Sequence, residues 1–141
     1  MKFICDAPGG KSWFRIETAA EAAAESALMR HAVEKFFQAE EEKATRKYRP
    51  TDTSFVEQDI GLKAHLLRSM PMFLTLRDEE GRALATAMLP PNGRDSVVFR
   101  SIIVGPSNSD PYPEQQSAIE ALGRRFLLSL DRARCYPYAR D

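Results

Sequence analysis

The chain has 141 residues, 43% of them hydrophobic and 28% charged, so it can build one core without a disulfide framework or a structural metal. Its 20 basic side chains balance its 20 acidic ones, which excludes a global positive field that would attract nucleic acid or acidic lipid. No apolar run approaches the ~20 residues that span a bilayer, and the N-terminus lacks the apolar segment of a secretory signal. We therefore expect a single cytoplasmic domain over residues 1–141.

The chain is predicted to open with a β-hairpin. Residues 3–5 form a short apolar strand, residues 8–11 are turn formers, and residues 13–17 alternate between apolar and polar. In the second strand Trp13 lies on the face opposite Phe14. Unless a helix covers that face, Trp13 is exposed, and an exposed indole is typical of a protein interface.

A continuous helical signal follows over residues 18–49. Thr18 and Glu21 have the spacing of a capping box at its start, and neither Gly nor Pro interrupts it before Pro50. Such a helix would be roughly 45 Å long at ~1.5 Å per residue, longer than the roughly 37 Å diameter expected of this domain. We expect its end to project from the body or to lie against a second copy.

The first part of this helix is rich in alanine. Ala20, Ala24 and Ala27 would let another backbone approach closely, so with Trp13 they are candidate interface residues. The alternative is that alanine serves helix propensity alone. The middle part carries a buried stripe of large apolar residues: Leu28, Met29, Val33, Phe36 and Phe37.

The last part of the helix is charged. Its basic residues follow directly on three glutamates at residues 40–42: Lys43, Arg46, Lys47 and Arg49. Pairs three and four residues apart, and cations at the helix C-terminus, stabilise a helix by themselves. Nucleic-acid binding through residues 43–49 is the weaker interpretation, because a phosphate-binding surface would not place three carboxylates one turn away.

The remaining elements complete an α+β pattern. A shorter helix begins with a capping-box spacing at Ser54 and Glu57 and ends before Pro71. Three strands are predicted at residues 72–77, 82–89 and 96–104, and a C-terminal helix at residues 114–132, followed by an irregular tail. Apolar residues on both faces of the third of these strands indicate a central strand or a sheet covered on both sides. The order ββ-α-α-βββ-α predicts a mostly antiparallel sheet of about five strands, with the long N-terminal helix, the short second helix and the C-terminal helix on one face.

No motif indicates a reaction, a cofactor or a known family. The Gly-Lys-Ser run at residues 10–12 lacks the earlier glycine of a phosphate-binding loop, because Cys5 stands there. His31 and His65 have no neighbouring ligand at metal-binding spacing. Cys5 and Cys135 are expected to be free thiols in a reducing compartment, although a disulfide between them stays an alternative. We expect neither a cofactor nor a metal.

One region is a candidate anion site. Arg94 precedes the last strand, Arg100 lies within it among apolar residues, and the loop at residues 105–113 ends at a helix start. Free N–H groups and the helix dipole favour an anion there, so Arg94 and Arg100 are the candidate anion-binding residues. The alternative is that Arg100 pairs with Asp78 or Glu80, or points to solvent.

Three functional hypotheses follow. The first is a non-catalytic interaction or regulatory module that self-associates, with a second copy or another protein as its partner. The second is a small-molecule-binding domain or enzyme with an anionic ligand near Arg100. The third is a weak nucleic-acid binder through residues 43–49. The first is the best supported, because two features favour it: the indole of Trp13 and the overlong helix with its alanine-rich first part.

Overall fold

The computed structural model describes residues 1–49 and 55–138. Its five strands form one sheet in chain order, and every neighbouring pair is antiparallel. The strands are β1 (Lys2–Ala7), β2 (Lys11–Ile16), β3 (Met72–Arg77), β4 (Ala83–Leu89) and β5 (Ile102–Val104). The helices are α1 (Ala19–Met29), α2 (Val33–Lys47), α3 (Phe55–Ser69) and α4 (Tyr112–Phe126). The predicted α+β class, the antiparallel sheet and the element order are confirmed.

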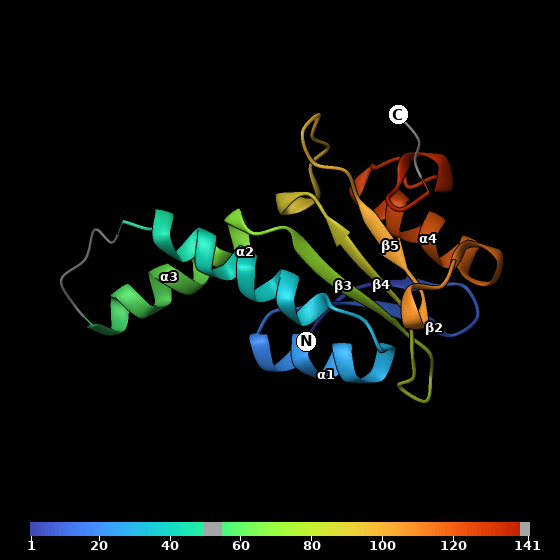
Figure 1. Ribbon diagram of the computed structural model, residues 1–141, viewed down its shortest axis with the longest axis horizontal. Helices are drawn as coiled ribbons and strands as arrows, with labels where there is room; N and C mark the ends of the chain where they lie inside the picture. The colour runs from blue at the N-terminus through green and yellow to red at the C-terminus, as the bar shows by residue number, and fades with distance from the viewer. Residues whose placement is uncertain (50–54, 139–141) are drawn as a thin grey trace.

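Helices cover both faces of the sheet, not one as expected (Figure 1). On the α4 side, Trp13, Leu74 and Leu76 pack with Ile119 and Leu122 in one buried cluster. On the other side, Ile16 and Phe73 pack against residues of α1 and α2: Ala22, Val33, Phe37 and Ala44. The helices are divided between the faces because strands β3 and β4 carry apolar side chains on both.

The predicted single helix over residues 18–49 is two helices. Arg30 adopts a left-handed backbone (φ 53°, ψ 53°) and donates its N–H to the carbonyl of Ser26, which ends α1. The Ser26 hydroxyl then accepts the N–H of Glu34 at 2.9 Å, in the first turn of α2. The break lets the apolar stripes of both helices meet the same sheet, which one straight rod could not do.

The charged end of α2 projects from the body, which is one of the two arrangements expected from the sequence. Figure 1 shows α2 and α3 side by side as a hairpin that extends beyond the sheet. Ala44 is buried in it, and its carbonyl lies 3.0 Å from Nε2 of His65. α3 of the same chain therefore covers one side of the projecting segment.

The last strand and the last helix are both shorter than predicted. β5 covers only Ile102–Val104 and lies at the sheet edge, and Val97 and Val98 are fully solvent-exposed. α4 ends at Phe126, because Leu127 adopts a left-handed backbone with φ 56°. The chain then returns along β5, where Ile102 and Tyr136 form a parallel bridge. The tail that was expected to be irregular thus covers part of this edge.

Other sequence predictions have mixed outcomes. Cys5 and Cys135 are both free, as expected. The loop at residues 50–53 and the predicted cap at Ser54 lie outside the described residues. Within residues 1–49 and 55–138, none of the helices combines the length and the apolar character that crossing a bilayer requires.

Candidate functional site

A carboxylate lies in the middle of the core beneath α1. Glu25 has no exposed surface and shares the sheet-facing side of α1 with Ala22 and Met29, three and four residues away. Helical spacing therefore places a charged group within an apolar stripe. A buried charge is tolerated only when a partner and hydrogen bonds compensate its lost hydration.

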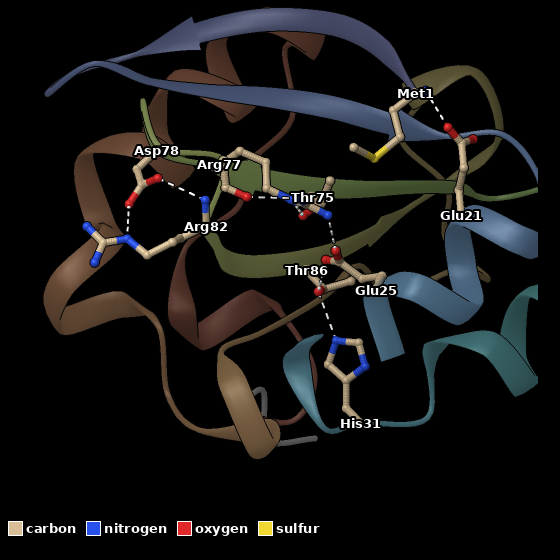
Figure 2. Close-up of polar contacts among 10 residues, drawn as sticks. Met1, Glu21, Glu25, His31, Thr75, Arg77, Asp78, Arg82 and Thr86 are labelled. Carbon is tan, nitrogen blue, oxygen red and sulfur yellow. Dashed lines mark hydrogen bonds and ion pairs between the residues drawn. The ribbon is translucent and has the colours of Figure 1, made fainter. Parts of the chain in front are cut away.

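Both oxygens of Glu25 have such partners, as Figure 2 shows. A guanidinium nitrogen of Arg77 lies 2.8 Å from Oε1, and the hydroxyl of Thr86 donates to Oε2 at 2.6 Å. The other guanidinium N–H groups of Arg77 donate to the Thr75 hydroxyl at 3.0 Å and to the Gly81 carbonyl at 3.1 Å. Among the described residues, no buried side-chain polar atom lacks a partner. Each guanidinium nitrogen of Arg77 and each carboxylate oxygen of Glu25 therefore has a hydrogen-bond partner.

Strand register brings these partners together. Thr75 of β3 pairs with Thr86 of β4, so the two hydroxyl side chains stand beside each other on the face below α1. Arg77 lies two residues beyond Thr75 and therefore points to the same face. The ion pair thus ties α1 to the two central strands.

His31 ends this chain of hydrogen bonds. Its Nε2 lies 2.8 Å from the Thr86 hydroxyl oxygen, and its Nδ1 lies 3.4 Å from the Val33 backbone nitrogen. A carboxylate can only accept, so Thr86 gives its one proton to Glu25 and must accept the N–H of His31. The network therefore assigns His31 as the neutral Nε2–H tautomer, with Nδ1 accepting from the Val33 N–H.

His31 and Thr86 line a pocket of about 350 Å³ between α2, β4, β5 and the C-terminal segment. The volume is within the range of small-molecule sites. The rest of the wall is largely apolar: Ala32, Val33, Phe36, Phe73, Ala87, Met88, Ile102, Val104, Asn108, Tyr136 and Pro137. This pocket is the candidate site, because its wall contains the end of the buried polar chain.

Burial lowers the pKa of His31 below its ordinary value of 6.5, although the Glu25 carboxylate acts in the opposite direction. The folded protein therefore binds fewer protons at His31 than the unfolded chain does. The stability that neutral His31 contributes is complete above pH 6.5 and is lost as the pH falls from 6.5 toward the folded pKa.

We expect wild-type protein to lose more stability between pH 7 and pH 5 than a His31→Gln variant, whose amide still donates to Thr86 but does not titrate. Urea denaturation at both pH values measures the difference. The other titrating groups are common to both proteins, so they cancel. An equal loss of unfolding free energy in the two proteins would show that protonation of His31 does not destabilise the fold.

The predicted anion site is not assembled. Arg100 lines a separate open pocket of about 670 Å³ with Ser129 and Arg134, but Arg94 does not line it. Tyr112, at the start of α4, lines a third pocket. Arg94 and Arg100 are both exposed, and the short β5 leaves residues 96–101 outside the sheet. Asp78 and Glu80, offered as partners for Arg100, both pair with Arg82 at 2.8 Å.

The interface candidates separate into two groups. Trp13 is fully buried under α4, and its indole N–H donates to the Ala118 carbonyl at 2.8 Å, so the expectation that it is exposed is wrong. Ala20, Ala24 and Ala27 are exposed on the outer side of α1.

The basic cluster contains one of the two ion pairs expected to stabilise the helix, and a further contact to the helix backbone. Arg46 pairs with Glu42 at 3.5 Å across one turn. The Arg49 guanidinium donates to the Arg46 carbonyl at 2.9 Å, at the C-terminal end of α2. These contacts explain the presence of two of the four basic residues, Arg46 and Arg49, by helix stabilisation alone.

Sequence reasoning missed the polar chain at Glu25, His31, Thr86 and Arg77. One signal was available, since Glu25 interrupts the stripe formed by Ala22 and Met29.

Within the described part of the chain, no group of three or more His, Cys, Asp or Glu side chains could hold a metal ion. Comparisons with protein-family models, with curated proteins and with solved structures find no match. Function must therefore be argued from the pocket itself.

Proposed function

We propose that this chain is a non-catalytic binding domain that takes a small, largely apolar ligand in the pocket at His31 and Thr86. One observation carries the proposal. A largely apolar wall contains a hydrogen-bonded polar pair, His31 and Thr86, which the ion pair of Glu25 with Arg77 holds in place. A mostly apolar cavity with a few fixed polar groups is the usual form of a small-molecule site.

The proton order favours binding over catalysis. The one hydroxyl proton of Thr86 is directed to the Glu25 carboxylate, whose other oxygen pairs with Arg77 in the core. None of the described lining side chains is a carboxylate, an amine or a thiol, and the one imidazole among them, that of His31, is hydrogen-bonded at both nitrogens. This arrangement favours orienting a ligand over reacting with one.

The pocket volume sets the size of the ligand. If each non-hydrogen atom takes up about 30 Å³, the share of one liquid water, the cavity holds about a dozen such atoms. Burying an eight-carbon chain gains about 6 kcal/mol at ~0.8 kcal/mol per methylene, before the cost of association. Because association costs at least about 4 kcal/mol, we expect dissociation constants of millimolar order or weaker.

Titration with 1-octanol, followed by the NMR signal of the Met88 methyl group, tests the proposal. Met88 lines the pocket, and Ala32 is an exposed residue of its wall. We expect a saturable shift in wild-type protein and at least roughly tenfold weaker binding in Ala32→Trp, whose indole fills the mouth; tenfold corresponds to ~1.4 kcal/mol.

The matched control is Ala24→Trp, which places the same indole on the exposed side of α1, outside the pocket lining. It should bind like wild type. The proposal fails if wild-type protein shows no saturable shift, or if Ala32→Trp binds 1-octanol as tightly as the control.

A second candidate function is self-association through α1. The most exposed side chains of this helix are all uncharged and apolar: Ala20, Ala24, Ala27 and Leu28. Leu28 is 60% exposed, and Phe36 of the adjoining α2 is 57% exposed. Sedimentation velocity over a range of concentrations tests this candidate, and a concentration-independent monomer would contradict it.

A further inference from the structure

The direction of each proton in the polar chain determines what the pocket wall can offer. Glu25 accepts from both Arg77 and Thr86, and Thr86 in turn accepts from His31. The hydroxyl proton and the imidazole N–H are therefore both committed within the protein. Neither can be donated to a ligand without breaking a bond of 2.6 or 2.8 Å.

Accepting capacity remains on Thr86. Its oxygen has two lone pairs, of which the N–H of His31 occupies one. Nδ1 of His31 already accepts the Val33 N–H. The buried polar part of the wall thus presents an acceptor.

The remaining polar lining side chains lie near solvent. Asn108 is exposed, and Tyr136 is 56% exposed. A ligand group that these residues bind keeps its contact with water, so they discriminate weakly. Among the described residues that line the pocket, none carries a cationic side chain, and a ligand carboxylate placed at Thr86 would approach the Glu25 carboxylate behind it. Selection between ligand types therefore depends on the His31–Thr86 pair.

Resting on the proposed function, we infer that the pocket is specific for ligands whose polar group donates a hydrogen bond, such as an aliphatic alcohol, and that it discriminates against the corresponding carboxylate. The alcohol proton binds the remaining lone pair of the Thr86 oxygen. A carboxylate has no proton to give and finds no free donor there, so its lost hydration is not compensated.

Three probes with the same eight-carbon chain test this inference at pH 7.5: 1-octanol, its methyl ether and octanoate. Binding to wild-type protein is followed at the Met88 methyl group. We expect 1-octanol to bind about three- to tenfold more tightly than the ether, which is the net worth of one hydrogen bond, although the ether is the more apolar molecule. Octanoate should bind most weakly.

Octanoate is costlier to dehydrate than 1-octanol in any apolar site, so the wild-type preference alone does not prove the inference. The decisive comparison is between wild-type protein and Thr86→Val. This variant removes the acceptor and frees the Nε2–H of His31, which becomes a donor in the wall. We expect the preference of the pocket for 1-octanol over octanoate to fall by at least roughly tenfold, the effect of one charge-assisted hydrogen bond gained by octanoate. Thr86→Ser retains the hydroxyl and should keep the wild-type preference. If Thr86→Val fails to fold, the comparison of 1-octanol with its methyl ether in wild-type protein decides the matter, because ether binding as tight as that of 1-octanol overturns the inference.

The outcomes separate the inference from the proposed function. Octanoate binding to wild-type protein as tightly as 1-octanol, with Ala32→Trp still blocking both, overturns the inference and leaves the binding function intact. An unchanged preference for 1-octanol over octanoate in folded Thr86→Val also overturns the inference. Saturable binding of none of the probes overturns both.

Discussion

Glu25→Gln is expected to lower the free energy of unfolding by about 3–5 kcal/mol, because it leaves the buried Arg77 guanidinium without its counter-charge. The side chain of Arg77 is only 15% exposed and that of Glu25 is not exposed at all, so water cannot replace the lost partner. Domains of this kind have total stabilities of about 5–15 kcal/mol. Urea denaturation of the variant and wild type measures the loss.

Two further variants show whether the loss comes from the buried pair. Glu42→Gln removes an exposed carboxylate that pairs with Arg46 on α2, and it should change stability by less than about 0.5 kcal/mol. A double variant, Glu25→Leu with Arg77→Met, should be more stable than Glu25→Gln because no unpaired charge remains. If Glu25→Gln loses no more than Glu42→Gln, the ion pair does not stabilise the fold.

Trp13→Ala is expected to cost about 3–5 kcal/mol, the typical loss when a buried aromatic side chain is removed. The indole has no exposed surface and packs between the sheet and α4, where its N–H binds the Ala118 carbonyl. The variant therefore leaves a cavity at the centre of the α4-side cluster. Leu28→Ala, on the exposed side of α1, serves as the control and should lose much less.

Fluorescence gives an independent measure of the Trp13 environment. Trp13 is the only tryptophan of the chain, so native emission reports on this one indole. We expect emission at short wavelength that iodide does not quench, and both properties should be lost in urea. Native emission of a water-exposed indole, or a Trp13→Ala loss no larger than that of Leu28→Ala, would contradict the burial of this side chain.

Local signals in the sequence predicted the elements of the fold well. The capping box at Thr18 forms as expected, since the Glu21 N–H lies 3.1 Å from the Thr18 hydroxyl and the Glu21 carboxylate accepts the Glu17 N–H at 2.9 Å. These contacts involve residues within one turn, so spacing alone reveals them. Strand alternation likewise placed Trp13 opposite Phe14 but could not show which face α4 would cover.

The break between α1 and α2 had no such local signal. No Gly or Pro stands between Thr18 and Arg49, and Arg30 takes up a left-handed backbone that costs a non-glycine residue roughly 1–2 kcal/mol. Packing of two apolar stripes on one sheet offsets that cost. Tertiary packing thus overrides local helix propensity. The helical periodicity of the sequence continues across the turn at Arg30, because the turn is needed only for packing on the sheet.

The candidate site was the hardest feature to predict, because its parts are far apart in the chain. Glu25 and Thr86 are 61 residues apart, and His31 and Thr86 are 55 apart. Their meeting depends on the register of β3 with β4 and on the turn at Arg30. By contrast, Arg94 and Arg100 were proposed from their proximity in sequence, and β5 proved too short to bring both to one pocket.

The ¹⁵N chemical shifts of the His31 imidazole at pH 7 test the central claim most directly, since the proton order at Glu25, Thr86 and His31 determines what the pocket can bind. We expect a protonated Nε2 and an unprotonated Nδ1, with a correlation from the Nε2 proton across to Thr86. Assignment is secured by its absence in His31→Gln, which leaves His65 as the one remaining histidine. A protonated Nδ1, either as the other neutral tautomer or as imidazolium, would contradict the hydrogen-bond chain.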